Sequence, residues 1–120
     1  MAEPINPNFN NIIKQIIKKS LFTERQIEIT LNQLHLQVTK FSITKGAYYR
    51  QVSQSRDKLL GLYYSIILFK GLGVFVPEDV DVINRLSEQI SMIQSSDVFP
   101  EREQEIINVI ESLVNRACRL

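Results

Sequence analysis

Apolar residues recur at three- and four-residue steps along most of this 120-residue chain. Such spacing places apolar side chains on one face of an α-helix, and no segment shows the sustained alternation of a half-buried strand. Only four glycines and four prolines interrupt the sequence, so long regular elements are expected. We therefore predict an all-α fold that forms a single domain over residues 1–120. The expected helices run approximately over Asn8–Ser20, Thr23–His35, Thr44–Lys70, Glu78–Gln94 and Pro100–Cys118.

Several of these helix ends carry local signals. Thr23 is followed three residues later by Gln26, which is the pattern of a capping box. The glycines of "GLG" at 71–73 predict the end of the long third helix, and Pro77 suits the first turn of the next one. A short strand over Val74–Val76 is an alternative for the connector between them. The second helix is expected to contribute a core stripe of Ile27, Leu31 and Leu34.

Charge is unevenly distributed along the chain. Residues 1–70 contain ten Lys and Arg against four Asp and Glu, or +6, whereas residues 71–120 contain four against nine, or −5. This asymmetry predicts that the basic half, 1–70, meets a polyanion and that the acidic half, 71–120, serves packing or dimerisation. The alternative is that the two halves simply attract each other.

Several classes of protein find no support in the sequence. The sequence contains no stretch of 18 apolar residues that could span a membrane, and its N-terminus lacks a secretory-signal pattern. Cys118 is the single cysteine, so we expect a cytoplasmic protein. His35 is also single, whereas a metal site needs three or four ligands. The carboxylates of "EREQE" have no histidine partner and read as charge at a helix start. We expect no enzyme activity, and no cofactor, metal or small-molecule ligand.

The most specific stretch is "SITKGAYYRQVSQSRDKL", from Ser42 to Leu59. With the upstream "FTERQIEITL", it resembles the helix-turn-helix of bacterial sigma-factor region 4 and of response-regulator output domains, over about residues 22–59. "SITKG" matches the turn, "AYYRQVSQSRDKL" matches the recognition helix, and Val38 and Phe41 match apolar positions of the preceding helix. The resemblance implies that the N-terminal part of the long helix contacts double-stranded DNA.

The residue types of this helix support the same function on physical grounds. In a helix that begins at Thr44, the residues expected to turn inward are Ala47, Val52 and Leu59. Tyr48 and Ser55 lie beside them. The remaining surface is rich in Arg and Gln, which contact base edges, and in Ser and Tyr, which contact phosphates. The alternative is an ordinary solvated face on a core helix. The candidate DNA-binding residues are Lys45, Tyr49, Arg50, Ser53, Gln54 and Arg56.

The long helix continues into an apolar run, "LLGLYYSIILF", over Leu59–Phe69. A helix that is apolar nearly all round is expected to be buried, either in the core or against a partner, and Tyr63 and Tyr64 are expected to be core residues. The last helix carries apolar residues at steps of four, three and four, the spacing of a helix-packing interface. Its predicted homodimer interface consists of Ile106, Ile110, Leu113 and Ala117. The alternative is that this stripe and the long helix pack within one chain.

Together these features predict a small homodimeric transcriptional regulator or DNA-associated factor that binds double-stranded DNA. Two alternatives remain open. The excess of apolar helix surface in a short chain also suits a helical protein–protein interaction module or a subunit of a larger assembly. The basic amphipathic segment "NIIKQIIKKSLF" would suit a helix that lies on a membrane surface.

Overall fold

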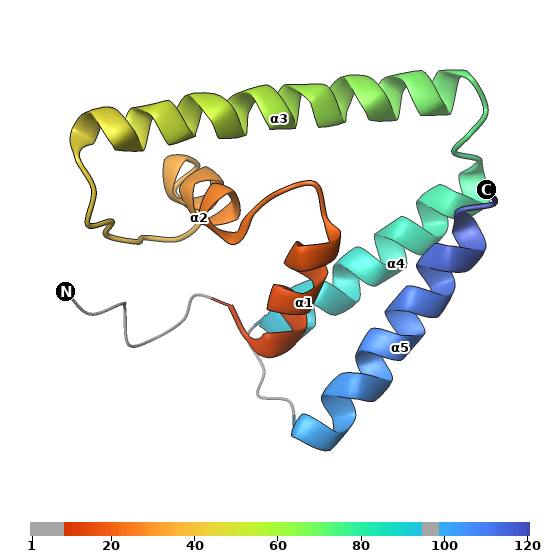
Figure 1. The fold of residues 1–120 in the computed structure, drawn as a ribbon. Helices are drawn as coiled ribbons and strands as arrows, with labels where there is room; N and C mark the ends of the chain where they lie inside the picture. The colour runs from red at the N-terminus through yellow and green to blue at the C-terminus, as the bar shows by residue number, and fades with distance from the viewer. Residues whose placement is uncertain (1–8, 95–98) are drawn as a thin grey trace. The chain divides into compact units, whose positions relative to one another are not determined.

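The computed structural model of the chain describes residues 9–94 and 99–120. These residues form five α-helices and no strand, which confirms the all-α fold with a long third helix. In place of a strand over Val74–Val76, the backbone N–H of Val76 donates a hydrogen bond to the Asp79 side chain. No helix in the described ranges is both long and apolar enough to cross a membrane. The helices are α1 (Asn11–Lys19), α2 (Glu24–Gln33), α3 (Lys45–Gly71), α4 (Pro77–Gln94) and α5 (Pro100–Ala117) (Figure 1).

The described chain divides into two compact units. The first contains residues 16–67, and the second contains residues 9–15 and 68–120. The first unit carries eight Lys and Arg against three Asp and Glu, and the second carries six against nine. The charge asymmetry of the sequence therefore coincides with a structural division.

In the first unit, α2 packs beside the N-terminal half of α3 (Figure 1). The predicted capping box is confirmed, because Gln26 N–H donates to Thr23 Oγ1 at 3.2 Å and Thr23 N–H donates to Gln26 Oε1 at 2.9 Å. The fully buried residue of α2 is Ile29, which lies off the predicted stripe, whereas Leu34 is 58% exposed. The stripe was wrong at Leu34, which is the C-cap of α2: its N–H still donates to Thr30 O at 3.1 Å, but its side chain is exposed.

The segment between α2 and α3 is not helical. His35 adopts a left-handed conformation with φ of 59°, and Leu36 N–H donates to Leu31 O at 2.9 Å, which closes the end of α2. Residues 34–44 then reach α3 without a further helix, and Val38 is 86% exposed. The segment around Val38 and Phe41, where the resemblance implied a helix, is therefore not helical. Side-chain contacts hold this linker instead, since Asn32 Oδ1 accepts a hydrogen bond from Thr39 N–H at 3.1 Å.

Both ends of α3 follow the sequence signals. At its start, Thr44 Oγ1 accepts a hydrogen bond from Ala47 N–H at 3.1 Å. At its end, Gly73 has φ of 86°, and Val74 N–H donates to Phe69 O at 2.8 Å. Glycine adopts this conformation without strain, so the predicted termination at "GLG" is confirmed.

The apolar second half of α3 is exposed, so it does not enter the core of this chain, and the other expectation, burial against a partner, stays a prediction. Tyr63 and Tyr64 are 61% and 71% exposed, and neither is a core residue. The reason is one of length. A ten-residue α2 extends about 15 Å, whereas the 27 residues of α3 extend about 40 Å, so α2 covers only part of its neighbour.

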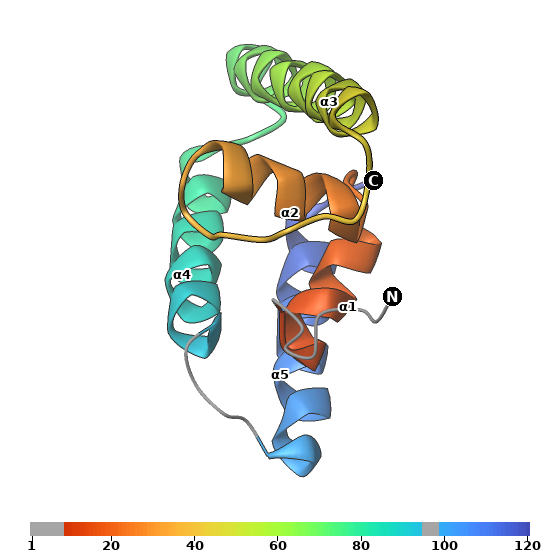
Figure 2. The same ribbon diagram turned by 90° about the vertical axis from the view of Figure 1, so that its left-hand side faces the viewer.

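In the second unit, α4 and α5 run antiparallel beside each other, as Figures 1 and 2 show. Asn10 ties the start of α1 to α4, because its Nδ2 donates to Ile93 O at 3.1 Å while its Oδ1 accepts from Ile13 N–H at 2.9 Å. One side chain thus caps α1 and reaches a carbonyl near the end of α4. The buried apolar residues of this unit are Phe9, Ile12, Ile93 and Ile107.

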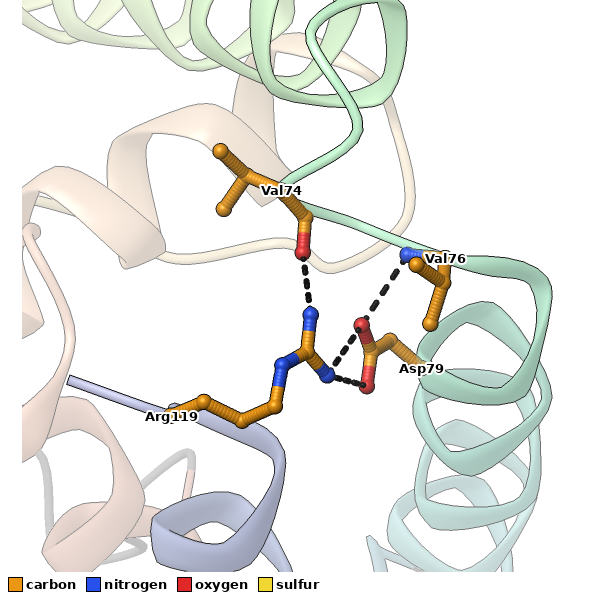
Figure 3. A network of polar contacts seen from close by, with 4 residues as sticks. All are labelled: Val74, Val76, Asp79 and Arg119. Carbon is orange, nitrogen blue, oxygen red and sulfur yellow. Dashed lines mark hydrogen bonds and ion pairs between the residues drawn. The ribbon is translucent and has the colours of Figure 1, made fainter.

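A polar network connects the C-terminal segment to the start of α4 (Figure 3). Arg119 Nη1 lies 3.3 Å from both carboxylate oxygens of Asp79, and its Nη2 donates to Val74 O at 2.9 Å. Asp79 Oδ2 also accepts a hydrogen bond from Val76 N–H at 3.0 Å. The Val76 hydrogen bond, assisted by Arg119, lowers the pKa of Asp79 below its ordinary value, although burial opposes the shift. The charged carboxylate is therefore the form that this network favours.

Candidate nucleic-acid interface

Tyr48 fixes the first turns of α3 to the end of α2. Its hydroxyl accepts a hydrogen bond from Asn32 Nδ2 at 2.8 Å and donates one to Gln33 Oε1 at 2.7 Å. Its ring lies 5.6 Å from the Phe41 ring, between centroids. The Arg25 guanidinium in turn lies 5.2 Å from the Phe41 ring centroid. The rotation of α3 about its own axis is thereby set at its N-terminal end.

Lys58 fixes the same helix three turns further on. Its ammonium group donates to Leu21 O at 2.8 Å and to Gln26 Oε1 at 3.0 Å, and it lies 5.9 Å from the Phe22 ring centroid. Between Tyr48 and Lys58, the most buried residue is Ser55, at 4% exposed. The predicted inward positions Ala47, Val52 and Leu59 are all half-buried. The predicted orientation of this part of α3 is therefore confirmed.

The opposite face of α3 presents the candidate DNA-binding residues to solvent. All six are exposed, and none of their side chains forms a hydrogen bond or an ion pair within residues 9–94 and 99–120. The structure thus leaves their polar groups available to a ligand. These residues are Lys45, Tyr49, Arg50, Ser53, Gln54 and Arg56.

Helical geometry divides the six residues between two adjoining strips. One strip spans about 80° of the helix circumference and about 16 Å along the axis, and it contains Lys45, Tyr49, Ser53 and Arg56. The other two, Arg50 and Gln54, lie on the adjoining strip. Asp57 is exposed beside them and is the single carboxylate of α3. An approaching polyanion would therefore find the more favourable charge along the Lys45–Arg56 strip.

A shallow depression of about 350 Å³ adjoins the start of this strip. The rings of Tyr48 and Tyr49 meet edge to face at its wall, with 5.3 Å between centroids. No sequence pattern predicts this depression, because its walls come from α2, the linker and α3, and no single repeat contains them. Its lining residues are Asn32, Thr39, Phe41, Ile43, Lys45, Tyr48 and Tyr49.

The predicted homodimer interface lies on the side of α5 that faces α4. Its four residues, Ile106, Ile110, Leu113 and Ala117, are half-buried. The first three line a groove of about 420 Å³ together with residues of α4 such as Leu86 and Ile93. Their role in dimerisation stays a prediction.

Other groups of the described chain form no recognisable reactive site. His35 and Cys118 are both exposed and lie in different units. Across residues 9–94 and 99–120, no group of three or more His, Cys, Asp or Glu side chains could hold a metal ion.

No protein-family model, curated protein or solved structure matches this chain.

Proposed function

We propose that this protein binds double-stranded DNA through the N-terminal half of α3, as a small transcriptional regulator or DNA-associated factor. The observation that carries the proposal is the exposed face of α3, whose six polar side chains form no hydrogen bond or ion pair within the described residues. Contacts to phosphates supply much of the affinity of DNA-binding proteins, and Arg and Gln side chains can also read base edges. The function is one of binding and requires no catalytic group.

The contacts of the charged side chains on and beside α3 identify which cations of this helix are available to DNA. Lys58 is occupied by two hydrogen bonds, and Arg25 lies 3.8 Å from Glu28 and stacks over a ring. Among the cations of α3 in the first unit, Lys45, Arg50 and Arg56 have no such partner. These three cations therefore form the core of the proposed contact.

The positions of these residues suggest a division of roles. Lys45 and Arg56, on the same strip as Tyr49 and Ser53, would contact the phosphate backbone. Arg50 and Gln54 would face base edges from the adjoining strip.

A single helix of this kind reads only a few base pairs, so we also propose that the protein acts as a homodimer on two half-sites about 34 Å apart. A cytoplasmic location is part of the proposal, since one exposed cysteine fits a reducing compartment.

The experiment is a fluorescence-anisotropy titration of a labelled random-sequence duplex at two salt concentrations. The Arg50→Ala, Arg56→Ala double variant removes one proposed base contact and one proposed phosphate contact, so we expect weaker binding and a salt-dependence slope that falls by about 0.9. A matched control, Arg102→Ala with Arg116→Ala, removes two exposed arginines from α5. Its net charge therefore equals that of the α3 double variant. It is expected to bind like the wild type.

The outcomes separate the proposal from its alternatives. Loss of affinity in the α3 variant alone supports the assignment. An equal loss in both variants would show a general charge effect and contradict it. A wild type that does not bind the duplex at low salt would favour the second candidate function, a helical protein–protein interaction module, which the exposed apolar half of α3 supports.

A further inference from the structure

An apolar stripe runs along the exposed face of α3 beyond the proposed DNA contacts. It consists of Leu60, Tyr63, Tyr64 and Ile67, which are 39%, 61%, 71% and 65% exposed. Their spacing of three, one and three residues keeps them within about 100° of the helix circumference. All four belong to the first unit, so the stripe is one continuous surface on one helix.

The composition around the stripe resembles the centre of a protein interface. No charged residue occurs between Lys58 and Lys70, and charged residues are depleted at the centre of interfaces. Tyrosine is one of the residues that contribute most to binding energy when an interface buries it. The stripe also has the three- and four-residue repeat by which two helices interlock.

The amount of exposed apolar surface is close to what a stable dimer needs. A large aromatic side chain can bury 150 to 250 Å², and an aliphatic one somewhat less. With the exposed fractions given above, the four side chains together expose about 500 Å² per chain. Specific interfaces bury about 800 Å² per partner, and the smallest about 600 Å². Polar side chains that flank the stripe would supply the remainder as the rim.

We propose that a second copy of this chain packs on the stripe, so that two α3 helices form a two-fold interface through Leu60, Tyr63, Tyr64 and Ile67. A two-fold contact uses the same surface on both copies, and one apolar helical stripe is complementary to its own copy. This interface differs from the predicted one on α5. It does not depend on DNA binding, because the two copies associate through residues outside the proposed DNA contact.

Sedimentation equilibrium of the full chain without DNA tests the proposal. The wild type is expected to be a dimer at tens of micromolar, with no larger species. Tyr64→Glu and Ile67→Glu are each expected to weaken self-association by about 100-fold or more, because each change places a charge in the interface twice. Tyr64→Phe keeps the ring and is expected to remain dimeric. Circular dichroism checks that the helices of every variant remain folded.

Two further variants make the test specific. Leu36→Glu introduces the same charge at a residue that is 70% exposed and lies off the stripe, so it is expected to leave the dimer intact. Leu113→Glu changes the predicted α5 interface instead. A monomeric wild type would overturn the proposal, and so would a dimer that Leu113→Glu dissociates while Tyr64→Glu and Ile67→Glu do not. Dissociation by Leu36→Glu to the same extent would also overturn it, since the effect would then be general.

Discussion

The Asn32 side-chain amide donates a hydrogen bond to the Tyr48 hydroxyl, with 2.8 Å between Nδ2 and Oη. The carbonyl oxygen of the same amide accepts from Thr39 N–H at 3.1 Å. One residue near the end of α2 therefore orients both the linker and the first turns of α3. The exposed face that we propose for DNA binding depends on this orientation.

Tyr48→Phe should destabilise the first unit without removing its ring contacts. The variant loses the hydrogen bonds with Asn32 and Gln33, which we expect to lower the free energy of unfolding by about 1 kcal/mol. Urea unfolding followed by circular dichroism measures the change. Tyr49→Phe is the control, because its hydroxyl has no hydrogen-bond partner in the described chain. Equal effects of the two substitutions would contradict the assigned role of Tyr48.

Lys58→Met should lower stability but leave DNA affinity and its salt dependence nearly unchanged. Methionine retains an apolar stem but loses the bonds to Leu21 O and Gln26 Oε1, and we expect a loss of about 1–2 kcal/mol. Arg56→Met removes the same charge two residues away and should weaken binding while preserving stability. Paired unfolding and anisotropy measurements compare them. If the two variants lost DNA affinity equally, the division between structural and binding cations would be wrong.

Ser55→Ala should stabilise the protein. The Ser55 hydroxyl is buried and has no hydrogen-bond partner among the described residues, and burial of an unsatisfied polar group is costly. Alanine also has the higher helix propensity, so we expect a gain of about 1–2 kcal/mol in the free energy of unfolding. Ser53→Ala is a matched control on the exposed face of the same helix and reports the propensity gain alone. A gain no larger than the control's would show that the buried hydroxyl costs nothing.

Asp79 should make stability depend on pH in the acid range. Its pKa is lowered from the ordinary 3.8, so the folded state binds a proton less readily than the unfolded state does. The stabilisation is complete above the ordinary value and is lost as pH falls through the lowered one. Asp79→Asn removes this charge but leaves an oxygen for Val76 N–H, so urea unfolding over an acid pH series should show a flatter dependence. Asp79→Ala should be less stable than Asp79→Asn at neutral pH, and a variant with unchanged acid dependence would contradict the role of this carboxylate.

Local signals in the sequence were sufficient to predict several of the helix ends. Thr23 with Gln26, the glycines after Phe69 and the proline at 77 each act within a few residues, so their effect does not depend on the rest of the fold. The start of α1, at Asn11 instead of the expected Asn8, and the end of α2 are exceptions. His35 occupies a left-handed position at the end of α2, and nothing in its spacing identified it, because glycine is the residue usually found at such a site.

The sequence by itself also determined which side of the first turns of α3 faces outward, because the helical repeat fixes how polar and apolar residues are separated. Only the tertiary structure decided what covers each face. The apolar residues from Leu60 to Ile67 looked like core, yet they are exposed, since the short α2 covers only part of the long α3. The depression beside Tyr48 likewise required three segments to meet. Helix boundaries follow from contacts within one or two turns, whereas burial depends on which other segments lie close enough to exclude water.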